Sequence, residues 1–202
     1  SPDGSKIVFS SARGCIGLFD EIEMCSDIYV MNSDGSDLTL LRHGASNAKD
    51  PSWSPDGKEI IFSQGKGGGY SGLSVMNADG TKQSDGWSSR EIWSTLMSQI
   101  HDPSWSPDGS KVLLTLEDRW SVGIYLVEPS TGDFNLLDSG LTMSKQPSLS
   151  PDGSKIAFSS YIDENYEIYV VNADGSDLTR LTTSPLESDT EPSWSPDGTK
   201  IV

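Results

Sequence analysis

Short apolar runs alternate with polar, turn-forming segments along the whole chain. Runs such as Ile60–Phe62, Ile156–Phe158 and Ile168–Val171 hold three or four successive apolar residues, and Gly, Pro, Asn, Asp and Ser cluster between them. Their length and their β-branched and aromatic residues favour strands that are buried on both faces. The apolar spacing of about 3.6 residues that marks an amphipathic helix is not visible. The pattern therefore predicts an all-β fold built from short strands.

One tetrapeptide, Ser-Pro-Asp-Gly, precedes many of these runs. It occurs five times, and successive copies lie 53, 52, 44 and 45 residues apart, starting at Ser1, Ser54, Ser106, Ser150 and Ser195. Its proline presets φ at the first turn position and its glycine accepts the left-handed position, so each copy predicts a tight hairpin turn. The basic unit is 44 to 45 residues, with insertions in the first two copies. A period of this size indicates a solenoid, an array or a propeller.

The fourth copy shows the organisation of one unit most clearly. Two turns and a polar loop over 160–165 separate four expected strands, which span 148–150, 155–159, 167–171 and 178–181. Four antiparallel strands per copy, with each sheet packed against the next, are the blades of a β-propeller. The Asn-x-Asp-Gly segments are interpreted as further hairpin turns, because Val, Leu or Gly occupies the positions where a calcium-binding loop needs acidic ligands.

Two longer motifs make the comparison with a known family specific. Asp-Pro-Ser-Trp-Ser-Pro-Asp-Gly occurs at Asp50–Gly57 and Asp102–Gly109, and Ile-Tyr-Val-Met-Asn-Ser-Asp-Gly occurs at Ile28–Gly35. These motifs resemble the repeat of the TolB-like propellers, a WD-repeat-like and usually six-bladed family, and the resemblance covers essentially the whole chain. Two segments depart from the family pattern. Glu128–Gly132 replaces the third turn of its copy, and Leu149 stands where the other copies carry tryptophan. The resemblance implies a periplasmic or secreted setting.

Residues 1–202 are expected to form a single, incomplete propeller domain of about four and a half blades. The repeats are assigned to 1–53, 54–105, 106–149 and 150–194, and a fifth begins at 195–202. Residues 195–202 match residues 1–8 at all but one position, so the two segments would compete for one place in a closed four-bladed ring. The chain also begins without Met and stops inside an apolar strand, which favours a window cut from a longer, six-bladed propeller.

The composition argues against several functional classes. The chain has 14 basic and 30 acidic residues and a formal net charge of −16, so a nucleic-acid partner is not expected. It has no apolar run of the length, about 18 residues, that would span a membrane. Only two histidines are present, and Gly-x-Ser-x-Gly, His-Glu-x-x-His and Cys-x-x-Cys motifs are missing. No catalytic, metal or cofactor site is therefore predicted.

A polar residue precedes Pro-Ser-Trp, or Pro-Ser-Leu in the fourth copy, at equivalent positions of the repeat. These candidate partner-binding residues are Asp50, Asp102, Gln146 and Glu191. The first strand of a blade is innermost, so we expect their side chains to circle one mouth of the central channel. Convergent carboxylates there would attract a cation or a basic partner segment. The alternative is that they satisfy backbone donors of the neighbouring inner strand.

The tryptophans and cysteines give further candidates. Trp53, Trp105 and Trp194 are interpreted as packing between blades rather than as sugar platforms. Candidate binding aromatics are Trp87, Trp93 and Trp120, in or near insertions and loops, although a simple capping role fits them equally. Cys15 and Cys25 share the first insertion, and we expect a disulfide in an oxidising compartment, with two reduced thiols as the alternative.

The leading functional hypothesis is a non-enzymatic module that binds a protein or peptide in the cell envelope, without a cofactor. It rests on the family resemblance. One alternative is the gating or substrate-binding propeller of a larger prolyl-oligopeptidase-like hydrolase, and another is a propeller of a carbohydrate-active protein. Since fold does not fix function, the repeats alone do not choose among them.

Overall fold

The computed structural model describes residues 1–13, 26–42, 47–67, 70–81, 99–128, 133–138, 140–184 and 186–202. Within these ranges the regular structure is entirely β-strand, and no helix there is long and apolar enough to cross a membrane. The cysteines Cys15 and Cys25 and the candidate aromatics Trp87 and Trp93 lie outside the described residues, so their predictions stay untested.

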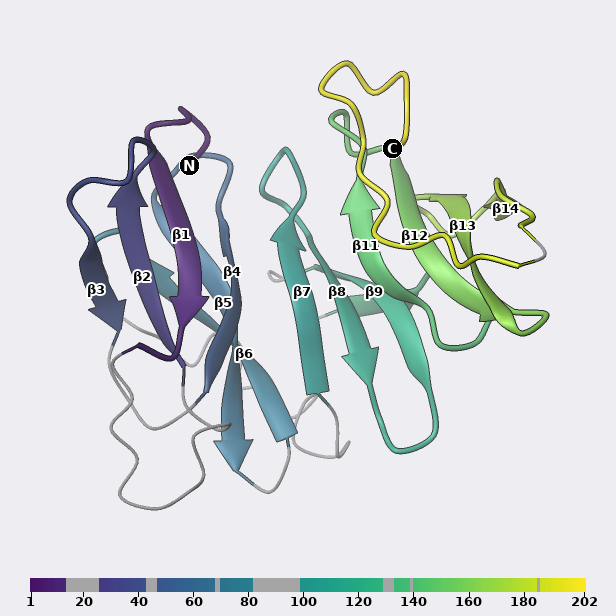
Figure 1. The fold of residues 1–202 in the computed structure, drawn as a ribbon, viewed down its shortest axis with the longest axis horizontal. Coiled ribbons are helices and arrows are strands. Elements are labelled where there is room, and N and C mark those ends of the chain that lie inside the picture. The colour runs from purple at the N-terminus through teal and green to yellow at the C-terminus, as the bar shows by residue number, and fades with distance from the viewer. Residues whose placement is uncertain are drawn as a thin grey trace. The chain divides into compact units, whose positions relative to one another are not determined.

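The strands form four antiparallel sheets (Figure 1). Sheet 1 has the order β1-β2-β3 and sheet 2 the order β4-β5-β6, whereas sheets 3 and 4 each have four strands, in the orders β10-β9-β8-β7 and β11-β12-β13-β14. The bounds in sheets 1 and 2 are β1 Lys6–Ser11, β2 Asp27–Asn32, β3 Thr39–Arg42, β4 Ala48–Trp53, β5 Glu59–Gly67 and β6 Tyr70–Asn77. Those in sheets 3 and 4 are β7 Gln99–Trp105, β8 Val112–Glu117, β9 Val122–Glu128, β10 Asp133–Leu136, β11 Lys145–Leu149, β12 Lys155–Ile162, β13 Asn165–Asn172 and β14 Thr179–Arg180. The all-β prediction is confirmed.

Each Ser-Pro-Asp-Gly segment folds as the predicted hairpin turn. The five glycines have φ between 68° and 73°, the left-handed values that favour glycine. The serine has a role that the sequence reasoning missed. Ser54 Oγ donates a hydrogen bond to Asp56 Oδ1 at 2.7 Å and accepts one from Glu59 N at 2.9 Å. The other four serines make the same two contacts at 2.6 and 2.9 Å, so one hydroxyl closes each turn.

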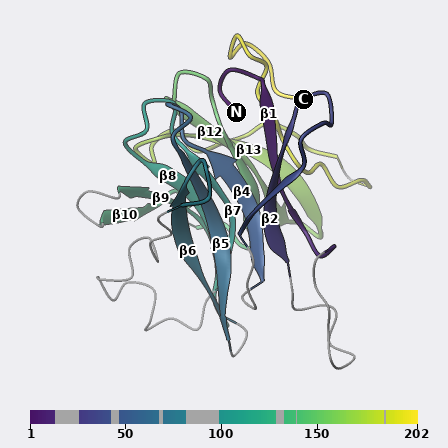
Figure 2. The same cartoon turned by 90° about the vertical axis from the view of Figure 1, so that its left-hand side faces the viewer.

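Contacts divide the chain into two compact units, unit 1 (Ser1–Trp105) and unit 2 (Ser106–Val202). The division coincides with a predicted repeat boundary. Within unit 1, Ile28 of sheet 1 packs against the fully buried Ile60 and Phe62 of sheet 2; Figure 2 shows β4, β5 and β6 side by side. Within unit 2, Ile124 of sheet 3 packs against Phe158 of sheet 4. The apolar runs are therefore buried between neighbouring sheets.

One expected loop is wrong. The polar stretch 160–165 was expected to separate two strands, but β12 extends to Ile162 and β13 begins at Asn165, leaving a two-residue turn. Both turn residues, Asp163 and Glu164, are left-handed, with φ of 51° and 69°. Tyr161 and Tyr166 pair across the strands with ring centroids 5.2 Å apart. The sequence Asp-Glu lacks the glycine that usually marks a two-residue hairpin turn. The cross-strand tyrosine pair stabilises the longer hairpin.

Candidate functional site

The four polar residues ahead of Pro-Ser share an uncommon backbone conformation. Asp50, Asp102, Gln146 and Glu191 have φ of 51°, 51°, 55° and 59°. Non-glycine residues rarely adopt positive φ, and each of these four is followed by proline, which further restricts its backbone. Local strain of this kind persists only where the surrounding structure enforces it, and it is often found at functional positions.

At Asp50 and Gln146 this conformation lies in a β-bulge of the inner strand. We call all four the bulge residues, because they occupy the same position of the repeat. In sheet 2 the register passes from the pair Lys49–Ser63 to the pair Ser52–Ile61, so two residues of β4 face one residue of β5. Sheet 4 repeats the bulge, between Lys145 and Ser148 of β11. A bulge re-aims the side chain that it contains and is frequently used near binding sites. The sequence signal that could have identified it is the pre-proline polar residue inside an otherwise regular strand.

Three of the bulge residues, Asp50, Gln146 and Glu191, lie within local polar networks. Ser63 Oγ donates to Asp50 Oδ2 at 3.4 Å, and Ser159 Oγ donates to Gln146 Oε1 at 3.1 Å. In unit 2 the structure also joins two candidates from successive repeats. Gln146 Nε2 donates to Glu191 Oε1 at 3.2 Å, and Glu191 N donates to Gln146 Oε1 at 3.3 Å. The first bond joins two side chains from successive repeats, and the second satisfies the backbone N–H of Glu191.

Two grooves lie elsewhere, where successive Ser-Pro-Asp-Gly turns approach each other. We call this end of the sheets the turn end, and the opposite end, where β8 joins β9 and β12 joins β13, the hairpin end. The groove in unit 1 has a volume of about 590 Å³ and includes Asp3 and Asp56. Its counterpart in unit 2, of about 360 Å³, includes Asp108 and Asp152. None of the four bulge residues lines either groove.

Acidic side chains at the turn end are strongly stabilised in their ionised form. A hydrogen bond from the serine two residues earlier, and another from the backbone two residues later, lower the pKa of each Ser-Pro-Asp-Gly aspartate to about 2. These carboxylates are already occupied in closing their turns. They therefore account for part of the acidic charge without forming a ligand site.

Two of the repeat tryptophans, Trp53 and Trp194, contact the neighbouring repeat, as the sequence suggested. Trp53 lies against the buried cluster that contains Ile28 and Ile60. Trp194 Nε1 donates to Ser148 O in the neighbouring inner strand at 3.0 Å. Trp120 differs: its side chain is 88% exposed, and it stands on the loop between β8 and β9. The structure therefore keeps Trp120 among the candidate binding residues.

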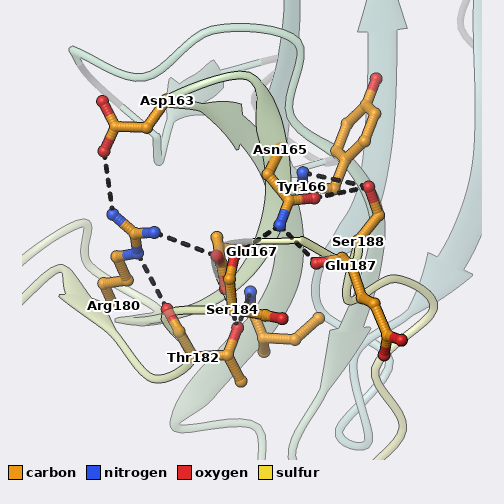
Figure 3. A network of polar contacts seen from close by, with 10 residues as sticks. Asp163, Asn165, Tyr166, Glu167, Arg180, Thr182, Ser184, Glu187 and Ser188 are labelled. Atoms are coloured by element: carbon orange, nitrogen blue, oxygen red, sulfur yellow. Dashed lines mark hydrogen bonds and ion pairs between the residues drawn. The ribbon is translucent and has the colours of Figure 1, made fainter.

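A buried ionic network, which the sequence reasoning missed, stabilises the hairpin end of sheet 4 (Figure 3). Glu167 is completely buried, and its Oε1 lies 3.0 Å from an Arg180 guanidinium nitrogen. Thr182 Oγ1 donates to Glu167 Oε2 at 2.5 Å, and Arg180 Nε donates to Thr182 O at 2.8 Å. Glu167 stands directly before the apolar run Ile168–Val171, and a carboxylate at that position was the available signal.

Sheet 3 also buries a carboxylate at its hairpin end, but different residues supply it. Gly123 precedes Ile124 as Glu167 precedes Ile168, and the space above it holds the Asp138 carboxylate. Asp138 is 2% exposed, and its Oδ1 accepts a hydrogen bond from Ile124 N at 3.2 Å. The equivalent backbone donor in sheet 4, Ile168 N, donates to Thr182 Oγ1 at 2.9 Å. Burial raises the pKa of Asp138. Sheets 3 and 4 thus each hold a buried carboxylate, supplied by the connection after β10 in sheet 3 and by β13 in sheet 4.

Comparisons with known proteins agree with this architecture. The family model of the TolB beta propeller domain matches residues 70–202. The chain is 39% identical over 85 residues to the Tol-Pal system protein TolB of Alcanivorax borkumensis, a match that covers 42% of this chain and 18% of that protein. It is 24% identical over 116 residues to the uncharacterized peptidase YuxL of Bacillus subtilis, covering 57% of this chain and 16% of that protein.

Solved structures show the same fold. TolB from Acinetobacter baumannii matches with a TM-score of 0.72 and 24% identity over 99% of this chain and 46% of that chain. Puromycin hydrolase matches with a TM-score of 0.65 and 14% identity over 100% of this chain and 32% of that chain. At these identities the likeness concerns the fold alone. The chain spans less than a fifth of either curated relative.

Proposed function

Because this chain belongs to the TolB beta propeller domain family, we propose that it is a non-enzymatic module that binds a protein or peptide partner in the cell envelope, in the periplasm or outside the cell. The observation that carries the proposal is the recurrence of a strained, polar, left-handed residue ahead of proline at the same position of four repeats, inside a β-bulge at Asp50 and at Gln146. A conformation that costs roughly 1–3 kcal/mol at each position is retained where the surroundings enforce it, and such strain clusters at ligand-binding sites.

Electrostatics favours a basic partner at this site. Three of the four bulge residues are carboxylates, and the chain carries a net charge of −16. Asp102 and Glu191 are exposed to solvent, and the Glu191 carboxylate is fixed by the Gln146 amide. An acidic surface steers and orients a cationic segment. We therefore propose Asp50 and Asp102 in unit 1, and Gln146 and Glu191 in unit 2, as partner-contact residues, on their conformation and charge.

The test is a selection of binding peptides from a phage-displayed random library against the whole chain. We then measure the selected peptides on a triple variant, Asp50→Asn, Asp102→Asn and Glu191→Gln. Amides keep most of the hydrogen-bonding capacity, so the fold should persist. Peptide affinity should fall by roughly tenfold or more, and its dependence on salt should decrease. Unchanged affinity per folded molecule would contradict this contact set.

A second candidate is favoured by the match to the uncharacterized peptidase YuxL. In that case the propeller would gate or select substrates for an attached hydrolase domain. The complete reading frame decides between the two, because a hydrolase of this kind carries a Gly-x-Ser-x-Gly nucleophile segment. If that segment is present, the full-length protein should cleave short chromogenic peptides, and replacing the motif serine by alanine should abolish the cleavage.

A further inference from the structure

Four exposed apolar side chains of unit 2 project from successive connections at the hairpin end. Trp120 is 88% exposed, Met143 49%, Tyr161 38% and Leu186 92%. They belong to the β8–β9 loop, the β10–β11 connection, the end of β12 and the segment after β14. Single exposed apolar residues are ordinary, but several on adjoining connections form a surface that marks interaction sites. We call these four residues the apolar strip.

Hydrogen bonds fasten the connections that carry the strip to one another. Ser144 N donates to Val122 O at 3.3 Å, which joins the Met143 connection to β9 beside the Trp120 loop. Tyr161 N donates to Thr142 O at 3.2 Å, and Thr142 Oγ1 donates back to Tyr161 O at 3.1 Å. The connections that carry the strip are therefore joined to one another from sheet 3 to sheet 4.

The two ends of the strip are fixed by side-chain caps. Asp118 Oδ1 accepts Trp120 N at 2.7 Å and Ser121 N at 2.8 Å, so the loop that presents the indole is held by its own carboxylate. Asn165 holds the segment around Leu186, because its Nδ2 donates to Ser184 O and Glu187 O (Figure 3). A preorganised surface loses less conformational entropy when a partner binds.

The charges around the strip are mainly negative. Acidic residues on the same connections are Asp118, Asp163, Glu164, Glu187 and Asp189. The basic residues there already have intramolecular partners. Arg119 lies over the Trp120 ring at 5.6 Å, Lys145 Nζ lies over the Tyr166 ring at 3.8 Å, and Arg180 pairs with Glu167. The surface thus combines exposed apolar anchors with an excess of carboxylates.

We propose that the apolar strip is a docking surface for an extended segment of a partner protein in which lysine or arginine alternates with aliphatic or aromatic residues. The partner's apolar side chains contact Trp120 and Met143, and its cations lie beside Glu164 and Glu187. Charge complementarity selects this occupant, because an acidic segment would be repelled and a purely polar one would leave the anchors exposed. The inference rests on the proposed binding function and adds both a location and a chemical class of partner.

The test uses defined synthetic peptides and the whole chain. The probe is a short peptide in which lysine alternates with leucine; the two controls alternate lysine with serine and glutamate with leucine. The lysine–leucine peptide should bind measurably by calorimetry, the lysine–serine control at least about tenfold more weakly, and the glutamate–leucine control not at all. Equal affinity of the lysine–leucine and lysine–serine peptides would overturn the proposal, because the positive charge of the peptide alone would then account for its binding.

Variants locate the binding. Trp120→Ser and Met143→Ser should each weaken the lysine–leucine peptide by about tenfold, whereas the matched Leu178→Ser, an exposed leucine at the turn end (36% exposed), should not. Glu164→Gln with Glu187→Gln should reduce the salt dependence. If Trp120→Ser binds as wild type does, the strip is not the docking surface. If a concentration-dependent dimer forms that Trp120→Ser abolishes, a second copy occupies the strip and the proposal also fails.

The outcome is separable from that of the proposed function. Loss of library-selected peptides in the triple bulge variant, with retention in Trp120→Ser, supports the bulge residues and overturns the strip. Loss in Trp120→Ser alone supports the strip and overturns the bulge contact set. Failure of the wild-type chain to select any peptide contradicts both.

Discussion

The buried ion pair of sheet 4 allows a quantitative test of the structure. Replacing Arg180 by methionine keeps an apolar stem of similar length but leaves Glu167, which is 0% exposed, without its cation. Removing one partner of a fully buried pair costs roughly 3–5 kcal/mol. The Arg180 side chain is 28% exposed and Thr182 still donates to Glu167. We therefore expect a loss of about 2–3 kcal/mol of unfolding free energy, below the fully buried value.

The assay is reversible urea unfolding followed by tryptophan fluorescence. Arg119→Met is the matched control, because it removes the same charge from an exposed loop residue and should change stability by about 0.5 kcal/mol or less. The double variant Arg180→Met with Glu167→Gln should recover a large part of the loss, since no uncompensated charge stays buried. Two results would refute the reasoning: an Arg180→Met curve that matches that of Arg119→Met, or a double variant that is as unstable as the single one.

Three further predictions follow from other contacts. The turn aspartates have pKa values of about 2 rather than the ordinary 3.8. Their contribution to stability should therefore be complete above pH 3.8 and should be lost as the pH falls toward 2. The urea midpoint of unfolding should decrease across this range, and a flat profile would contradict the turn geometry. Gly123→Ala would place Cβ 2.9 Å from Leu136 Cδ1 and 3.2 Å from Asp138 Oδ1, and thermal unfolding should reveal a loss of about 1–3 kcal/mol. Trp194→Phe removes the donor to Ser148 O and should cost about 1 kcal/mol more than Trp53→Phe, whose indole N–H has no acceptor among the described residues; equal losses would contradict a role for that bond.

The sequence predicted the sheets because their signals are local. Ser-Pro-Asp-Gly sets a turn through proline and glycine, and the apolar runs behind it set strands that need cover on both faces. The sequence did not predict the hairpin over 160–165, since its turn residues Asp163 and Glu164 are left-handed without being glycine. The Tyr161–Tyr166 contact that extends this hairpin appears only once the two strands are paired.

The candidate site was predicted by position but not by geometry. The pre-proline pattern identified Asp50, Asp102, Gln146 and Glu191, whereas the bulges at Asp50 and Gln146 depend on strand register, which cannot be read from sequence spacing. The buried carboxylates were missed for a similar reason. Asp138 accepts Ile124 N directly, whereas the equivalent Ile168 N is accepted by Thr182 Oγ1, which in turn donates to Glu167; the two carboxylates stand at different positions of their repeats, so repeat spacing does not reveal them.

The two ends of the sheets differ in how much their sequences vary. At the turn end the same tetrapeptide recurs, and the same serine contact closes all five turns. At the hairpin end sheets 3 and 4 differ: sheet 3 combines Gly123 with Asp138, and sheet 4 combines Glu167 with Arg180. Uniform connections maintain a scaffold, whereas variable connections on a rigid scaffold are where binding specificity is commonly placed. This contrast is an independent reason to expect partner recognition at the hairpin end, where Trp120 is exposed.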